Sequence, residues 1–437
     1  MQTISWPGKD QWPSWQKILF RFFFAYFILY ITPWWFLDYI PGGNYFTQYY
    51  YSFNDWLVNT ANNKLFHLYK TLVPLNGSGD TSYAWIQLWL YLALALLGCT
   101  VWTMADARHS NYNRIGYWFR IMLRYFLIAN CFSYGYAKIF LQQMPFPNLS
   151  QLSTPLGDFL PMRLSWMFMG YSTTYQFFAG AMEVIAGLLL LFRRTSTFGA
   201  MAATGVFLNV MAMNLGYDIP VKLYSMHLVI IGMVLLCFEH KRILSFFTNQ
   251  AASAGSLYNI TVAKSWMRIL IWVSKIAFII LIIILPFKDT YEEYRQGNQP
   301  QIIAPIQAGV YEVSRFAVNH DTIPFTYADS LRWKDVIFEN GYLGSICTTD
   351  TLFRQRYGRG YFNFSFDSAR QKIFFSKRTV TFDSIPLFSM KLEMPDSNTI
   401  LLSGLVRKDT VFAELKKTKR HFQLAEKQFH WLSEYNR

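Results

Sequence analysis

One carboxylate, Glu183, lies near the middle of an apolar run of membrane-span length, FAGAMEVIAGLLLLFRR (178–194). In a helix it would lie roughly 13 Å from each membrane interface, at a rise of 1.5 Å per residue. A charge at that depth costs at least about 2.5–3.5 kcal/mol, so Glu183 must face a bundle interior, stay protonated or have a partner. Gly180 and Gly187 share its helical face and allow close helix approach. We predict that Glu183 is a proton acceptor or ligand contact; the alternative is a hydrogen bond that locks two helices.

The neighbouring apolar segments supply polar residues at depths from which they can reach this carboxylate: Lys138, His227, Asn209 and Asn214. With Glu183 they are expected to line a polar pocket that opens toward the outer face, with Lys138 or His227 donating a hydrogen bond to a ligand. Arg124 shares a helical face with Lys138 and is a further cofactor-binding candidate. Snorkelling to an interface is the alternative for Lys138 and Arg124, and helix packing is the alternative for His227.

Metal and thiol chemistry have little support in the sequence. No second histidine stands at metal-ligand spacing from His227, and the cysteines form no CxxC pair. The four cysteines are Cys99, Cys131, Cys237 and Cys347. Three of them fall inside apolar runs, so we expect buried thiols and no metal site or disulfide framework.

Composition indicates a membrane protein with a soluble part. Hydrophobic residues make up 53% of the 437 residues, aromatic residues 19% and charged residues 15%. Residues 1–288 hold 20 Lys and Arg against 9 Asp and Glu, whereas residues 289–437 hold 20 against 17. The excess of positive charge therefore lies between apolar segments, where Lys and Arg set membrane topology. Because this charge has that role, we exclude nucleic acid as a partner.

Seven segments approach the roughly 20 apolar residues that a membrane-spanning helix needs. They lie at 16–37, 84–105, 116–140, 174–192, 196–216, 221–239 and 266–287. An N-terminus inside puts thirteen Lys and Arg on the inner side and six on the outer side, which satisfies the positive-inside rule. We therefore predict a polytopic α-helical bundle in a bacterial inner membrane, in contact with membrane lipid, with its N-terminus cytoplasmic and its C-terminal domain periplasmic. An aromatic, amphipathic stretch at 45–73 is predicted to lie at the interface.

After Pro286 the pattern changes to period two, as in GYFNFSFDS (360–368), which is typical of a half-buried strand. About eight short strands at this spacing predict a C-terminal all-β domain, a small antiparallel barrel or a sandwich. The expected domains are N-terminal spans and an interfacial segment (1–115), a four-helix core (116–245), a linker and last span (246–288), and an extracytoplasmic β domain (289–437).

Residues 116–245 resemble the DoxX-like family of bacterial inner-membrane proteins, which have a four-helix core. The matching features are Gly135 and Lys138 in a GxxK pattern, Glu183 with Gly187, FRRT (192–195) and YDIPVK (217–222). The β domain is similar to the tail of long family members, which end in an FHWLSEYNR type of sequence (429–437). The resemblance implies a link to quinone-dependent redox chemistry or to electron delivery, although this chain lacks the cysteine pair of the latter branch.

Two classes of function follow. The first is a redox-linked membrane protein that binds a quinone-type ligand in its bundle, with Glu183 as proton acceptor. The second is a non-catalytic transporter or envelope assembly factor whose β domain binds an extracytoplasmic partner. A third reading rests on a more distant similarity to vitamin K-dependent carboxylase-like enzymes, in which Lys138 would be the catalytic base.

Overall fold

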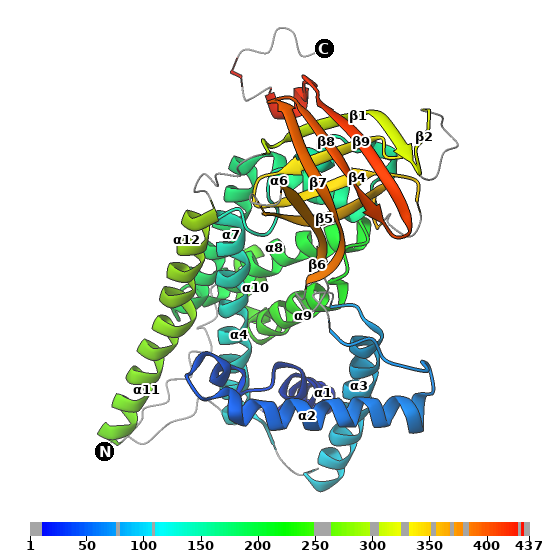
Figure 1. Ribbon diagram of the computed structural model, residues 1–437. Helices are drawn as coiled ribbons and strands as arrows, with labels where there is room; N and C mark the ends of the chain where they lie inside the picture. Colours follow the sequence, from blue (N-terminus) through cyan, green and yellow to red (C-terminus); the bar gives the residue numbers. More distant parts are fainter. Residues whose placement is uncertain are drawn as a thin grey trace. The chain divides into compact units, whose positions relative to one another are not determined.

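The computed structural model describes residues 11–75, 79–106, 110–248, 264–297, 306–324, 332–350, 355–367, 371–378, 384–426 and 430–431. The terminal motif at 429–437 therefore lies, apart from 430–431, outside the described residues. The chain divides into two compact units (Figure 1). One comprises Met1–Pro145 and Phe168–Gly297, and the other comprises Phe146–Met167 and Asn298–Arg437.

Helices form the first unit. They are α1 (Ser14–Ile31), α2 (Asn44–Ala61), α3 (Ser82–Ala105), α4 (Asn113–Ile139), α7 (Thr173–Leu191), α8 (Ser196–Gly216), α9 (Lys222–Phe238), α10 (His240–Phe247), α11 (Ser265–Phe278) and α12 (Leu285–Gly297). A π-helical segment, η4 (Ile279–Ile284), joins α11 to α12. α4 packs against α7 and α9, α8 packs against α7 and α9, and α1 packs against α3.

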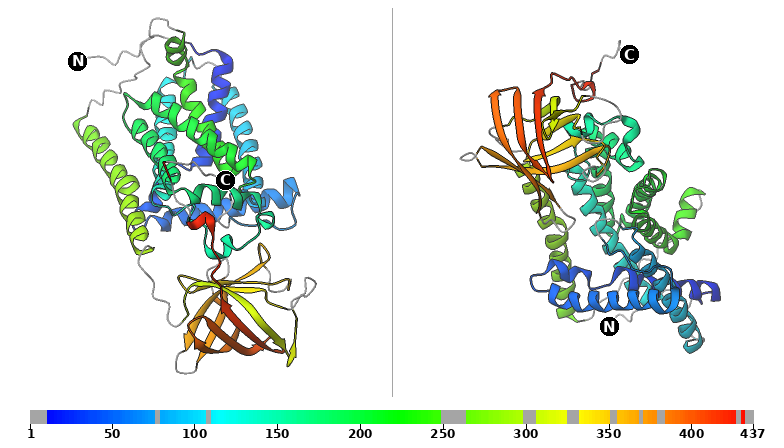
Figure 2. Two further views of the ribbon diagram at one scale, coloured as in Figure 1. Left: turned by 90° about the horizontal axis from the view of Figure 1, so that it is seen from above. Right: turned by 45° about the vertical axis from the view of Figure 1, so that its right-hand side comes forward.

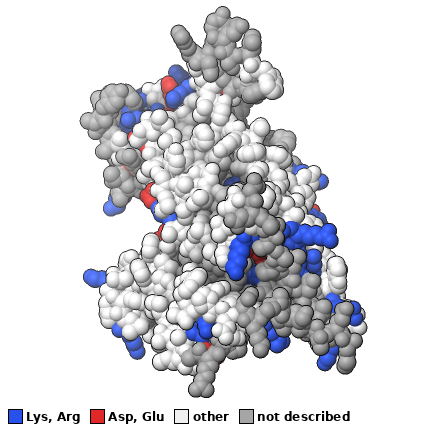
Figure 3. All heavy atoms as spheres, turned by 180° about the vertical axis from the view of Figure 1, so that it is seen from behind, with Lys and Arg blue, Asp and Glu red and all other residues white. Residues whose placement is uncertain are grey.

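Each of the seven expected spans is mainly helical in the structure, but fewer helices are long and apolar enough to cross a membrane. Within the described part of the chain, five helices are long and apolar enough, or six if α9 and α10 form one span bent by 78°. α4 is not among the five, although it has 27 residues. It carries four basic residues, Arg114, Arg120, Arg124 and Lys138. These findings are compatible with a membrane protein, and Figure 3 shows broad uncharged areas on one face of the molecule.

Residues 45–61 of the aromatic stretch at 45–73 lie in α2, which runs across the direction of α4 in Figure 1. Val58 and Ala61 are buried on one side of this helix, whereas Tyr45, Phe46 and Tyr49 are 70–80% exposed. A helix with exposed aromatic side chains on one face is typical of a segment that lies along a membrane surface.

A closed antiparallel barrel of eight strands forms most of the second unit (Figure 2). The strands are β1 (Gly309–Val318), β3 (Asp335–Glu339), β4 (Leu343–Cys347), β5 (Arg359–Asp367), β6 (Lys372–Arg378), β7 (Ser384–Asp396), β8 (Thr399–Val406) and β9 (Asp409–Lys417). Each pairs with the next, and β9 closes the barrel on β1. The two-residue strand β2 (Asp321–Thr322) extends the end of β1. The prediction of a C-terminal all-β domain is thus confirmed, and the barrel alternative is the correct one.

Alternating side chains fill the barrel. Phe362 and Phe364 of β5 are buried, as the period-two pattern of that segment predicts, and they meet Phe338 of β3 edge to face. Ile400 and Leu402 of β8 and Leu415 of β9 are fully buried in the same cluster. The interior is therefore a packed apolar core, as small barrels usually have.

Residues between α4 and α7 also belong to the second unit. They form α5 (Leu149–Leu152), a 3₁₀ turn η3 (Leu156–Asp158) and the first residues of α6 (Pro161–Tyr171). Asn148 caps α5 by accepting the Gln151 amide, while the Gln151 side chain accepts the Asn148 amide. This capping box stabilises a helix too short to be stable alone.

Candidate functional site

Glycines set the distance between α4 and α7. A Cβ atom on Gly135 would lie 2.7 Å from Val184 Cγ2 and 3.0 Å from the Gly180 carbonyl oxygen. A Cβ atom on Gly180 would lie 2.6 Å from the Gly135 carbonyl oxygen. The distances of 2.7 and 2.6 Å are too short for a larger residue at either position, so the two helices are in close contact at this point. Small residues at such crossings are typical of helix pairs in membranes.

Lys138 and Glu183 face each other across this close contact. Lys138 Nζ lies 2.8 Å from Glu183 Oε1 and 2.9 Å from Oε2, and the two side chains are 6% and 1% exposed. The ammonium group also lies 5.5 Å from the centre of the Tyr134 ring. Two charges buried together cost much less than either would cost alone. The contact requires a lysine that donates both hydrogen bonds and a carboxylate that accepts them.

His227 is held by other residues. Its Nδ1 lies 2.6 Å from the Leu223 carbonyl oxygen, which can only accept, so this nitrogen carries a hydrogen. In the neutral ring, Nε2 then accepts a 2.5 Å hydrogen bond from the Tyr26 hydroxyl. The ring also stacks on Tyr30 with 3.9 Å between centres. Both ring nitrogens are satisfied between α1 and α9, which matches the helix-packing alternative for this residue.

None of the other three predicted site residues takes part in the Lys138–Glu183 ion pair. Asn214 Nδ2 donates to the Val221 carbonyl oxygen at 3.4 Å and ties the end of α8 to the start of α9. Asn209 is exposed on α8. Arg124 lies 14 residues before Lys138 on α4, roughly 21 Å away along the helix. The structure thus joins Lys138 to Glu183, and no described hydrogen bond or ion pair links His227, Asn209, Asn214 or Arg124 to either of them.

Further polar contacts in the helical unit were not predicted. Asn130 of α4 accepts a 2.5 Å hydrogen bond from the Tyr224 hydroxyl of α9. Gln176 of α7 makes two hydrogen bonds with the backbone of Met144, accepting from its amide and donating to its carbonyl oxygen. The position of Gln176 on the same helical face as Glu183 was the signal available for it.

Arg21 is a buried cation that was not predicted as a site residue. It is 3% exposed on α1. Its guanidinium donates to the Tyr112 hydroxyl, to Thr103 Oγ1 at 2.9 Å and to the Asp106 carbonyl oxygen at 2.8 Å. It thus joins α1 to the end of α3 and the start of α4. An arginine inside an aromatic run, RFFFAYF, was the sequence signal.

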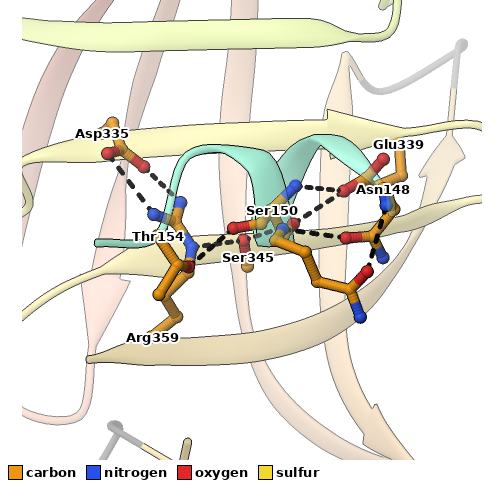
Figure 4. Close-up of polar contacts among 8 residues, drawn as sticks. Asn148, Ser150, Thr154, Asp335, Glu339, Ser345 and Arg359 are labelled. Carbon is orange, nitrogen blue, oxygen red and sulfur yellow. Dashed lines mark hydrogen bonds and ion pairs between the residues drawn. The ribbon is translucent and has the colours of Figure 1, made fainter. Parts of the chain in front are cut away.

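A second polar cluster lies on the outer wall of the barrel (Figure 4). Asp335 of β3 and Arg359 of β5 both stand opposite Cys347 of β4, so they share one row of the sheet. Their side chains form an ion pair, and Arg359 Nε donates to Ser345 Oγ at 2.8 Å. Arg359 is 2% exposed although it points outward from the barrel core.

The segment that begins at α5 covers this cluster. Ser150 donates its amide and its hydroxyl to Glu339 Oε1, each at 2.7 Å, and the Leu149 amide donates to Oε2 at 3.2 Å (Figure 4). Ser345 Oγ lies 2.7 Å from Ser150 Oγ. Ser150 and Ser345 are 1% and 0% exposed, so neither hydroxyl can reach a substrate. The cluster therefore holds residues 148–154 on the barrel and is not a nucleophilic site.

The burial also changes proton affinities in this wall. Desolvation raises the pKa of the Cys347 thiol above its usual value, and the nearby Asp335 carboxylate raises it further. Desolvation likewise raises the pKa of the Tyr361 hydroxyl. Both groups are therefore neutral near pH 7.

No metal centre is evident in the part of the chain that the structure describes, where no three His, Cys, Asp or Glu side chains are grouped to hold an ion. The fit of a quinone is also poor at the predicted place. Both Glu183 oxygens are engaged by Lys138, and the helices on either side touch at Gly135 and Gly180.

Comparisons with known proteins give one informative match. The chain is 30% identical over 128 residues to the "Uncharacterized protein YwoB" of Bacillus subtilis, which is 29% of this chain and 80% of that protein. No family model matches the chain, so the DoxX resemblance stays a prediction. No solved structure matches it either.

Proposed function

We propose that this chain, which belongs to the same family as YwoB of Bacillus subtilis, is a non-catalytic envelope protein of the bacterial inner membrane. In this proposal the helices are the scaffold and the barrel is the part that binds an extracytoplasmic protein. The apolar helices support a membrane location. The excess of Lys and Arg in the expected inner loops favours the N-terminus-inside orientation that this arrangement needs.

The observation that carries the proposal is the mutual satisfaction of Lys138 and Glu183. A proton acceptor or ligand contact needs a free face toward its substrate, whereas this carboxylate uses both oxygens on one lysine. The pair lies beside the close contact of α4 and α7 at Gly135 and Gly180, where it fixes their register. A buried polar pair that fixes register is the best-attested structural use of such groups.

The barrel supports a binding role through its outer surface, since its interior is filled. Phe374 of β6 and Leu405 of β8 both stand opposite Ser389 of β7, and they are 41% and 62% exposed. Two large apolar side chains in one outward row are suited to a protein contact. The opposite wall, β3 to β5, already holds a segment of the same chain.

Photo-crosslinking of the full-length protein in cells tests this proposal. A photoreactive amino acid at position 374 or 405 is expected to give a defined adduct, whereas the same group at Ser314, an exposed position on β1, is expected to give none. The isolated segment 289–437 is unsuitable for the test, because it would lack residues 146–167 and expose the cluster around Arg359.

Quinone-linked redox chemistry is the competing function. It would gain support if quinone were extracted from the purified protein and if Glu183→Gln removed the bound quinone while the fold was kept. Under the scaffold proposal no stoichiometric quinone is expected, and K138M/E183L protein is expected to keep its crosslinked partner. Loss of that partner in a folded double variant would overturn the proposal.

A further inference from the structure

An arginine-lined pocket lies at the end of the bundle away from Lys138. It is a partly open pocket of about 90 Å³ between the start of α4, the end of α7, the start of α8, and α9 with α10. Its charged lining residues are Arg120, Arg124, Arg193, Arg242 and Glu239. The volume is several times what a single water molecule requires, and is suited to a compact ionic group.

The balance of charge in the pocket favours an anion. Four guanidinium groups face one carboxylate, and that carboxylate is already engaged, since Arg120 Nη1 lies 3.1 Å from Glu239 Oε1. Planar guanidinium groups bind the oxygens of phosphate in pairs of parallel hydrogen bonds.

Arg124 supplies a second, independent indication. Its Nε atom is buried and has no hydrogen-bond partner among the described residues. The described contact of its guanidinium is with the Tyr125 ring, 5.4 Å from its centre. A buried N–H without a partner costs about 1–3 kcal/mol, a cost that an anion in the pocket would remove.

The first turn of α8 adds backbone donors. Ser196 and Thr197 line the pocket at the start of this 21-residue helix, where amide groups are not used within the helix. Partial positive charge at a helix N-terminus stabilises bound phosphate.

The short helix α10 indicates where the anion comes from. It turns by 78° from α9, and its apolar residues Leu244, Phe246 and Phe247 are 59–77% exposed, while its Arg242 lines the pocket. A short helix with exposed phenylalanines and a basic face is suited to the headgroup region of a bilayer. Basic pockets between helices at that level bind anionic headgroups.

We propose that this arginine pocket binds a phosphate group, and that the group belongs to an anionic membrane lipid. This inference does not depend on the scaffold function proposed above, since it concerns residues that the Lys138–Glu183 pair does not contact.

Thermal unfolding of the full-length protein in neutral detergent tests the proposal, with phosphatidylglycerol, phosphatidylcholine and inorganic phosphate as probes. Phosphatidylglycerol is expected to raise Tm, and phosphatidylcholine is not. Arg193→Gln should weaken phosphatidylglycerol binding about tenfold. Arg194→Gln is the matched control, because Arg194 is the next residue and exposed, but does not line the pocket.

The outcomes separate the possibilities. Loss of the lipid effect in Arg193→Gln and its retention in Arg194→Gln support the proposal. Equal stabilisation by inorganic phosphate and by phosphatidylglycerol, with the same sensitivity to Arg193→Gln, would support the phosphate site but overturn its lipid source. If both variants lose the lipid-induced rise in Tm equally, the lipid binds to surface charge in general and the pocket is not the site. The proposal is also overturned if neither phosphatidylglycerol nor inorganic phosphate raises Tm.

Discussion

Lys138 Nζ lies 2.8 and 2.9 Å from the two carboxylate oxygens of Glu183, with both side chains buried between α4 and α7. The relationship answers why a carboxylate stands in the middle of an apolar helix: its charge is balanced by a lysine in the last turn of the neighbouring helix. The two residues are 45 positions apart, so the pair also fixes the register of α4 against α7.

Removing one partner of this pair is expected to destabilise the protein more than removing both. Lys138→Met or Glu183→Leu leaves an uncompensated buried charge and should cost about 3–5 kcal/mol. The double variant K138M/E183L buries no charge and should recover most of that loss. Thermal unfolding in detergent measures the three Tm values, and a double variant as unstable as the sum of the single variants would contradict the pairing.

Gly180 is expected to be intolerant of even a methyl group. A Cβ atom there would lie 2.6 Å from the Gly135 carbonyl oxygen and 2.9 Å from Lys138 Cβ, so Gly180→Ala must push the helices apart, at about 1–3 kcal/mol. Gly205→Ala in α8 is the control, since nothing lies within 4 Å of a Cβ atom there. That variant should keep or slightly raise Tm, because alanine favours the helix over glycine. A similar Tm for the two variants would rule out the close contact.

Local patterns predicted the features that depend on nearby residues. The alternation around Phe362 and Phe364 predicted a strand with one buried face, and β5 has it. Asp218 and Lys222 are only four residues apart, and Lys222 Nζ lies 2.7 Å from Asp218 Oδ1. Glu183 was identifiable because an ionisable group is rare in such a segment.

Contacts between residues far apart in the sequence could not be predicted from local patterns. His227 bonds to Tyr26 across 201 positions, and an isolated histidine gives no sign that a tyrosine of the first helix will satisfy it. Ser150 and Glu339 are 189 positions apart, and neither residue's local sequence indicates the other as its partner. Residues 146–167, between α4 and α7 in the sequence, belong to the unit that contains the barrel.

Glu339→Ala is expected to release residues 148–154 from the barrel. The change removes the acceptors for the Leu149 and Ser150 amides and for the Ser150 hydroxyl, and leaves buried donors without partners at about 1–3 kcal/mol in total. Hydrogen exchange should then become faster at residues 149 and 150.

The control for that experiment is Glu393→Ala on β7. Glu393 pairs with Lys391 at the surface, where both side chains are about half exposed, and such pairs contribute roughly 0–1 kcal/mol. Exchange at residues 149 and 150 should not change in this variant. Unchanged exchange in the Glu339→Ala protein would show that the carboxylate does not hold the segment.

Cys347 is expected to react slowly with alkylating reagents near neutral pH. Burial raises the pKa of its thiol above the ordinary 9.0, and only the thiolate reacts. The folded chain thus keeps this proton to higher pH than the unfolded chain does. Its contribution to stability is therefore fully present below about pH 9 and is lost as the pH rises through the pKa of the thiol in the folded chain.

Iodoacetamide labelling of the full-length protein between pH 7 and pH 10 measures the pH at which Cys347 becomes reactive. The C347S variant assigns the labelled site, and the urea-unfolded chain is the reference. A labelling midpoint at or below that of the unfolded chain would contradict the burial of this thiol beside Asp335.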